Sequence, residues 1–368
     1  MKPIAYILGT FPSLTETFLL REMVELRRQG VPLKLYALWR PTRGEPVHVD
    51  AVSLQQGVTY APRWWKPRVM GCDVVARHFA SQMIRDGICH VHATFANLPA
   101  TVGMLAAQQL DVPFSFAGHA RDIFVEGDFL EIKVAAAKFV VTCTSEGRRA
   151  LIERCGDISF ENVYHIPHGI DVRRYRFTLR SPQTTHVILA VGRLVEKKGF
   201  GTLLNALDIL KRRRFPMSCV IVGEGPLRAQ LVRLNRSLGL TDCVRLVGEY
   251  PHEMVVTLMA CADVLVVPSV IAPDGDRDGL PNVILEAAAL GTPIVASRLP
   301  GIAEFMEDEV TGLLVEPNDA ASLARAIERV CTLSHLKARM ILNARRKVAE
   351  QFDVRKNVAR LAELFREA

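Results

Sequence analysis

The chain has 368 residues, of which 49% are hydrophobic and 23% are charged. This composition is ordinary for a soluble globular protein and excludes the collagen, coiled-coil and disordered classes. The length exceeds what one hydrophobic core usually serves, so we expect two domains. Lys and Arg number 46 against 39 Asp and Glu, which gives a formal net charge of +7. This mild basic excess suits anionic ligands or an anionic membrane surface.

The eight cysteines show neither a Cys-x-x-Cys pair nor a zinc-finger spacing, as is typical of buried thiols in a reducing compartment. No apolar stretch approaches the roughly 18 residues of a spanning helix. The opening run PIAYILGTF leads into a charged helix, which predicts a first strand and no signal peptide. We therefore expect a cytoplasmic protein. Trp64 and Trp65 lie beside cations, where they would suit a lipid headgroup layer, a sugar or plain packing.

The first elements predict a parallel sheet. Ile4 to Leu8 has the pattern of a buried strand, and Ser13 and Glu16 have the spacing of a capping box, so a helix should begin at Ser13 and stop at Gly30. Strand, helix and strand in this order imply a right-handed crossover. Further elements repeat the pattern, with strands at Leu33 to Leu38, His90 to Ala93, Phe114 to Ala117 and Phe139 to Thr142, and a helix at Leu98 to Leu110.

The alternation breaks at the run IPHGID, which begins at Ile166 and is followed by a polar stretch, and this is the best domain boundary. The predicted fold class is α/β, with Rossmann-like domains at 1–170 and 171–350 whose parallel sheets face a central cleft. Ligands bind at the carboxyl ends of the strands in such sheets. The strands of the second domain are expected at Val187 to Val191, Cys219 to Val222, Val244 to Val247, Val264 to Val267 and Ile294 to Ala296.

The segment 268–291 carries the clearest functional pattern. Asp278 precedes a predicted helix and Glu286 lies inside it. The amides of Gly279 and Leu280 and the positive end of the helix dipole suit a phosphate, and a carboxylate can accept hydrogen bonds from sugar hydroxyls. Asp278 could instead cap the helix and Glu286 could be solvated, but an unpaired carboxylate within the run NVILEAAALG is costly. The segment therefore predicts a nucleotide-sugar site.

Two glycine-containing turns follow strands of the second domain. Arg193 and Lys198 in VGRLVEKKG could neutralise a departing diphosphate, or could be surface charges. Gly223 and Glu224 belong to VGEGP, either a tight turn that approaches the nucleoside or an ordinary loop. This turn lacks the full G-x-G-x-x-G pattern, so a dinucleotide fingerprint is not supported.

The first domain offers weaker candidates. His119 follows a strand and could contact the transferred sugar or the acceptor, but it could also cap a helix or lie satisfied in the core. His90 and His92 share one face of a strand, and because no third ligand is nearby, we expect no metal. The amides of Gly9 and Thr10, aimed by the first helix, would face the diphosphate.

Several motifs in this order resemble family 4 of the retaining glycosyltransferases, and the likeness covers nearly the whole chain. They are FPSLTETF, HVHATFANLPA, FAGHARDIF, VGRLVEKKG, VGEGP, VVPS, DGLPNVILEAAALGTPIVAS and GLLVEPND. The chain is most similar to the bacterial branch that builds exopolysaccharides and related glycoconjugates. The resemblance implies the GT-B architecture, with the segment 351–368 crossing back to the first domain. It also implies a donor bound mainly by the second domain and transfer with retained anomeric configuration, without a metal or other cofactor.

The same match assigns roles to single residues. It implies that Arg193 and Lys198 hold the diphosphate, that Glu286 holds the ribose hydroxyls and that Asp278 holds the donor hexose. His119 matches the family's histidine that faces the sugar. The family usually has Glu where this chain has Asp278, a side chain shorter by one methylene.

The resemblance implies a UDP- or GDP-linked hexose as donor and a glycan, glycolipid or small molecule as acceptor, with room for peripheral contact at the inner membrane surface. The segment between Tyr60 and Cys89 is shorter than in relatives, which makes the acceptor the least transferable inference. A sugar-nucleotide sensor or partner subunit without catalysis is the alternative, and an epimerase or phosphorylase on the same fold is another. Nucleic-acid binding is not expected, because the chain has no concentrated basic stripe.

Overall fold

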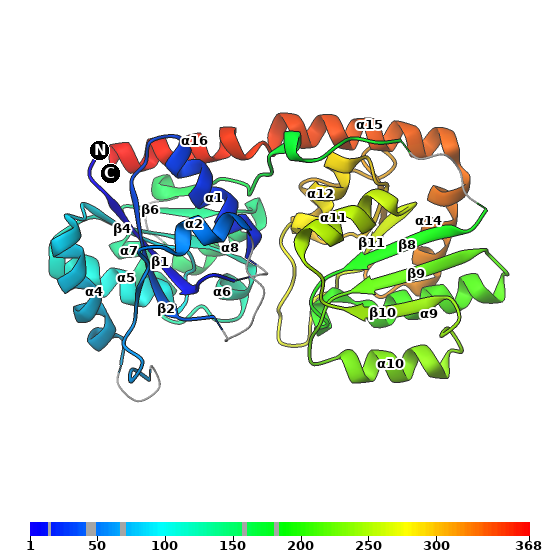
Figure 1. Cartoon of the computed structure of the whole chain (residues 1–368), viewed down its shortest axis with the longest axis horizontal. Coiled ribbons are helices and arrows are strands. Elements are labelled where there is room, and N and C mark those ends of the chain that lie inside the picture. Colours follow the sequence, from blue (N-terminus) through cyan, green and yellow to red (C-terminus); the bar gives the residue numbers. More distant parts are fainter. Residues whose placement is uncertain (14–15, 42–48, 67–70, 157–159, 180–183) are drawn as a thin grey trace. The chain divides into compact units, whose positions relative to one another are not determined.

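The computed structural model describes residues 1–13, 16–41, 49–66, 71–156, 160–179 and 184–368. The chain divides into two compact units. Unit 1 consists of Met1–Gly169 and Val354–Ala368, and unit 2 consists of Ile170–Asp353. Each unit contains a parallel sheet with helices packed against it (Figure 1), so the predicted α/β class with two parallel sheets is confirmed.

Unit 1 is built on a seven-stranded sheet of order β3-β2-β1-β4-β5-β6-β7. Its strands are β1 Ile4–Thr10, β2 Leu33–Trp39, β3 Thr59–Tyr60, β4 His90–Ala93, β5 Phe114–Gly118, β6 Phe139–Thr142 and β7 Val163–His165. Its helices are α1 Thr17–Arg28, α2 Val49–Gln55, α4 Cys72–Asp86, α5 Leu98–Leu110, α6 Ala120–Phe124, α7 Leu130–Ala136, α8 Ser145–Cys155 and α16 Val354–Glu367.

Both faces of the unit 1 sheet are buried. Successive residues of β1 alternate between two apolar clusters, with Ile7 in one and Tyr6 in the other, as side chains of a strand must. Helices α4 and α5 pack in the first cluster, and α1 and α16 pack in the second, where they lie side by side (Figure 1). Phe365 of α16 meets Tyr6 edge-on with 6.3 Å between the ring centroids. The C-terminal segment therefore completes the core of unit 1.

Unit 2 is built on a six-stranded sheet of order β10-β9-β8-β11-β12-β13. Its strands are β8 His186–Val191, β9 Met217–Val222, β10 Val244–Gly248, β11 Val264–Val267, β12 Ile294–Ser297 and β13 Leu313–Val315. Its helices are α9 Phe200–Arg212, α10 Arg228–Ser237, α11 His252–Cys261, α12 Asn282–Leu290, α13 Pro300–Ala303, α14 Ala320–Thr332 and α15 Ser334–Gln351.

Unit 2 repeats the layering of unit 1. In β8, Ile188 and Ala190 face a cluster formed with α9 and α14, whereas Leu189 faces a cluster formed with α11, α12 and α15. The central strand β11, Val-Leu-Val-Val, is therefore apolar and buried throughout, because it is covered on both sides. All its strands point the same way, which brings the loops that follow β8, β9 and β11 to one edge of the sheet.

The predicted start of the first helix is wrong. Helix α1 begins at Thr17, and Glu16 occupies the position before it without a side-chain cap. Strand β1 continues to Thr10, and the Phe11 amide still donates to the Trp39 carbonyl of β2 at 3.3 Å. The chain is therefore tied to the sheet up to residue 11, and the described helix begins four residues after Ser13.

The tryptophan pair is divided between core and surface. Trp65 is buried, donates from Nε1 to the Gly71 carbonyl at 2.9 Å and stacks on Trp39. Trp64 is 59% exposed and lies between the exposed cations Arg63 and Lys66. Plain packing therefore explains Trp65 only. No helix in the described ranges is long and apolar enough to span a bilayer.

Candidate functional site

The loops that follow three strands of unit 2 are bonded to one another. The Leu194 amide, after β8, donates to the Glu224 carbonyl, after β9, at 2.8 Å. The Val270 amide, after β11, donates to the Lys197 carbonyl at 2.8 Å. These bonds fix the backbone that carries the predicted site residues.

Glycines allow this close approach of backbone to backbone. A Cβ on Gly199, whose φ is +61°, would lie 1.9 Å from the Pro268 carbonyl oxygen, and a Cβ on Gly223, whose φ is +142°, would lie 2.0 Å from that of Gly192. Only glycine fits both the space and the left-handed backbone. Gly223 therefore serves the packing of the two loops, and its approach to a nucleoside remains a prediction.

Lys198 and Asp278, 80 residues apart, form a buried ion pair. Lys198 Nζ lies 2.9 Å from Asp278 Oδ1 and 2.8 Å from Oδ2, and the Ser269 hydroxyl donates to Oδ2 at 2.6 Å. The side chains of Lys198 and Asp278 are only 16% and 8% exposed. The structure thus brings together the residue expected to hold the diphosphate and the residue expected to hold the hexose.

A second lysine supports the same carboxylate. Lys197 Nζ lies 2.9 Å from Asp276 Oδ1 and 3.9 Å from Asp278 Oδ1. Burial alone would raise the pKa of Asp278, but the charges of Lys198 and Lys197 outweigh burial and lower it. Asp278 is therefore held as a carboxylate that can accept hydrogen bonds.

Three hydrogen-bond donors near Lys198 and Asp278 in the sequence make no bond to the described part of the protein. The Arg193 side chain is exposed, and its guanidinium makes no hydrogen bond or ion pair with the described residues. Over the same part of the chain, the amides of Gly279 and Leu280, ahead of α12, donate to no protein acceptor. Unpaired amides at the start of a helix and an unpaired guanidinium are the groups that bind phosphate.

Glu286 is buried within α12 and has partners. His252 Nε2, at the start of α11, lies 3.1 Å from Glu286 Oε1, and the Tyr175 hydroxyl lies 3.5 Å from the same oxygen. A solvated face for Glu286 is excluded, because the residue is only 2% exposed. Glu224, by contrast, is an exposed residue whose carboxylate pairs with Arg228 at 3.0 Å.

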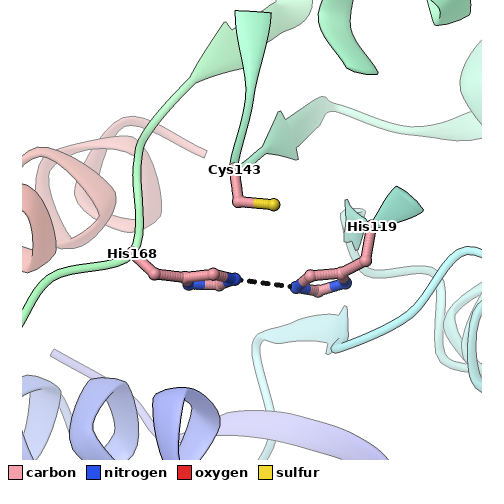
Figure 2. Close-up of side chains that lie close together, drawn as sticks. All are labelled: His119, Cys143 and His168. Atoms are coloured by element: carbon pink, nitrogen blue, oxygen red, sulfur yellow. Dashed lines mark hydrogen bonds between the residues drawn. The ribbon is translucent and has the colours of Figure 1, made fainter. Parts of the chain in front are cut away.

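The candidates of unit 1 lie at the carboxyl edge of its sheet. His119 is the N-cap residue of α6, and its backbone amide donates to the Asp122 carboxylate at 2.7 Å as in a capping box, so the expectation that His119 could cap a helix has structural support. Its Nε2 lies 3.1 Å from Nε2 of His168 (Figure 2). Burial lowers the pKa of His119 to about 4, so the ring is neutral near pH 7. Contact between His119 and the transferred sugar or the acceptor remains a prediction.

The sequence singles out two further pairs of residues in unit 1, and the structure explains the first pair only. His90 Nε2 and His92 Nδ1 both bond the Ser115 hydroxyl, at 2.6 and 2.8 Å, so this pair is a buried hydrogen-bond network. Gly9 and Thr10 close β1. Because the Ser13 helix start is wrong, the argument that aimed their amides at a diphosphate no longer holds, and their role stays a prediction.

Two units, each built on a parallel sheet with helices packed against it, match the architecture of GT-B glycosyltransferases. The fold is shared by HepE of Anabaena in complex with UDP, with a TM-score of 0.79 and 20% identity over 100% of both chains. Residues 171–347 match the family described as glycosyl transferases group 1. Unit 2 therefore contains a domain of this group, and the chain as a whole is similar to the family 4 type of GT-B glycosyltransferases.

Curated relatives agree with this assignment. The chain is 36% identical over 198 residues to the amylovoran biosynthesis glycosyltransferase AmsK of Erwinia amylovora, a match that covers 54% of this chain and 49% of AmsK. The chain therefore spans about half the length of this relative. It is 28% identical over 400 residues to WcaL of Escherichia coli, named for colanic acid biosynthesis, covering 95% of this chain and 96% of WcaL.

Sequence reasoning missed several members of the site. The Ser269 hydroxyl bonds to Asp278, Lys197 to Asp276 and His252 to Glu286. No local sequence pattern indicates these contacts. Outside these contacts of unit 2, in unit 1, His168 of the predicted boundary turn and Cys143, one of the scattered thiols, lie beside His119 (Figure 2).

Proposed function

We propose that the protein transfers a hexosyl unit from a UDP- or GDP-linked sugar to a hydroxyl of a glycan, glycolipid or small-molecule acceptor, with retained anomeric configuration and without a metal or other cofactor. The Lys198–Asp278 pair, beside donors that the protein leaves unused, supports this best. The backbone just before Arg193 lies close to Lys198, because a Cβ on Gly192 would be 3.3 Å from the Lys198 side chain.

The proposed reaction needs charge stabilisation more than covalent chemistry. The bond between the anomeric carbon and the phosphate oxygen breaks, the acceptor oxygen bonds to that carbon from the same face, and the acceptor proton passes to the departing phosphate. Negative charge then develops on the diphosphate, where Arg193, Lys198 and the two amides stabilise it. An ammonium has three N–H donors, so Lys198 can keep Asp278 and still bind a phosphate oxygen.

The two carboxylates would position the donor. Asp278 is ionised and fixed by Lys198 and Ser269, which leaves lone pairs to accept hydrogen bonds from hexose hydroxyls. Glu286 would accept the ribose hydroxyls, with His252 orienting its carboxylate. The proposal extends to a cytoplasmic protein that touches the inner membrane surface, where the exposed Trp64 between two cations would make the contact.

The double variant Arg193→Ala/Lys198→Ala tests the mechanism. Loss of one donor at a developing anion lowers turnover by about 100-fold or more, so the pair should lose at least that. Transfer is measured as nucleotide released from a panel of UDP and GDP sugars with an acceptor, and the anomeric configuration of the product is read by NMR. Arg213→Ala, an exposed residue beyond α9, is the control.

The outcomes separate the alternatives. Near-normal turnover by the double variant would refute the assignment of these cations. Wild-type protein that binds a nucleotide sugar yet turns over no donor with any acceptor would favour the sensor or partner subunit. Full activity after treatment with EDTA is expected, and a loss restored by Mg²⁺ would contradict metal-independent transfer.

A further inference from the structure

Three side chains with soft or borderline donor atoms meet at the carboxyl ends of adjacent strands in unit 1. His119 follows β5, Cys143 follows β6 and His168 follows β7 by three residues. The pairing of β5 with β6 and of β6 with β7 brings these ends together. One ligand atom from each residue lies within 4.8 Å of the others, and the Cys143 sulfur lies to one side of the hydrogen bond that joins the two imidazoles (Figure 2).

The spacing fits a tetrahedral ion of the zinc class. Two imidazole nitrogens on one zinc, each about 2.05 Å away, are about 3.3 Å apart, and a nitrogen and a thiolate sulfur are about 3.6 Å apart. The two Nε2 atoms are 3.1 Å apart. From 4.8 Å at most, the sulfur needs to move by about 1.2 Å, which a change of the cysteine χ1 angle can supply.

Both imidazoles are ready to bind a metal. Burial lowers the pKa of His119 to about 4. The pKa of His168 is also lowered, by burial first and then by His119 and Arg21. Neutral imidazoles bind metal without competing protons. Nδ1 of His119 has no hydrogen-bond partner in the described ranges, so it can carry the ring proton when Nε2 binds a metal.

We propose that His119, Cys143 and His168 form a site for Zn²⁺ or a similar borderline divalent cation, with water in the fourth position. The metal takes the lone pair of each Nε2, and the proton that one Nε2 carried moves to Nδ1 of the same ring. The Cys143 thiol releases its proton to water and binds as thiolate. The positive charge of Arg21 opposes the ion, and the thiolate compensates for it, so the site favours a thiolate-binding metal over Mg²⁺.

Occupancy of this site would inhibit the enzyme. This part rests on the proposed function and on the role implied for His119, which matches the family's histidine that faces the sugar. An imidazole whose Nε2 holds a metal cannot offer that nitrogen to a substrate. Transfer itself needs no metal, so the ion acts as an inhibitor and not as a cofactor.

Metal binding is tested without any substrate. Untagged full chain is titrated with Co²⁺, and we expect one ion per chain with a thiolate-to-cobalt charge-transfer band that Zn²⁺ removes. Loss of an outer-shell partner lowers metal affinity 10- to 100-fold, so Cys143→Ser and His168→Gln should each lower Zn²⁺ affinity at least about tenfold in chelator competition. Cys89→Ser, in the same unit, should bind as the wild type does. Thermal unfolding of each metal-free variant checks that it folds.

Transfer assays then test inhibition. Zn²⁺ should inhibit the wild type and Cys89→Ser but not Cys143→Ser, whose basal transfer should be unchanged. Equal Zn²⁺ affinity in the wild type and both site variants, or a cobalt complex without the thiolate band, would overturn the site. Equal inhibition of the wild type and Cys143→Ser would overturn its inhibitory role. The cobalt titration needs no turnover, so it tests the metal site even if no nucleotide-sugar donor is found and the proposed function fails.

Discussion

Replacing Lys198 by Met should destabilise the protein in a way that depends on pH. Removing one partner of a buried ion pair typically lowers the free energy of unfolding by about 3–5 kcal/mol, because the other charge stays buried. Here Lys197 Nζ remains 3.9 Å from the carboxylate and Ser269 still donates to it. We therefore expect the free energy of unfolding to fall by about 2–3 kcal/mol at pH 7, at or below the lower end of that range.

The pH dependence follows from Asp278. In the wild type its pKa is lowered, since the charges of Lys198 and Lys197 outweigh burial. A depressed pKa in the folded state contributes stability above the unfolded value of about 3.9, and that contribution is lost as pH falls through the folded value. In Lys198→Met, burial should dominate and raise the pKa of Asp278, so the carboxyl protonates earlier and the penalty shrinks. The difference between wild type and variant should be larger at pH 7 than at pH 4.

Urea unfolding at both pH values measures this difference. Lys211→Met is the matched control, because Lys211 pairs with Asp242 at 2.6 Å but the two side chains are 38% and 67% exposed. Exposed pairs contribute little, so the control should be close to wild type at both pH values. If Lys198→Met is no less stable than this control, or loses the same amount at pH 4 as at pH 7, the buried pair does not behave as described.

Two further predictions concern unit 1. Ser115→Ala removes the hydroxyl shared by His90 and His92 and leaves buried nitrogens without a partner, so the free energy of unfolding should fall by at least about 1–3 kcal/mol; an unchanged thermal midpoint would contradict the network. Trp64→Ala should weaken co-sedimentation with anionic vesicles, whereas Phe129→Ala, which also removes an exposed aromatic side chain, should not. Equal binding by both variants would argue against membrane contact through Trp64.

The strands of both sheets could be predicted because they are buried on both faces. The strands at His90, Phe139 and Val264 have the predicted bounds, since short runs of β-branched and aromatic residues between turns leave little freedom. The edge strands β3, β7 and β13 were missed, because two or three residues are too few to show a period. The first helix begins at Thr17 and not at Ser13, and the chain ahead of it is still bonded to β2 at Phe11.

The sequence identifies residues of the candidate site but does not show which of them contact one another. Motif and position identified Lys198, Asp278 and Glu286, yet nothing local shows that Lys198 meets Asp278 or that Glu286 meets His252. Such pairs depend on which strand ends are neighbours and on the course of each loop. The same limit hid the approach of His168 to His119, because β7, which positions His168, was itself not predicted.

The return of α16 to unit 1 has a consequence for biosynthesis. A ribosome releases residues 1–169 first and then the whole of unit 2 before Val354–Ala368 emerges. Until then the apolar side chains of α1 and of the sheet that pack with Val358, Leu361 and Phe365 stay exposed to water and to other nascent chains. Unit 2 is contiguous and can fold as soon as it has been made, whereas unit 1 must wait until Val354–Ala368 has also been made. Chaperone contact during expression should therefore concentrate on unit 1, although it is made first.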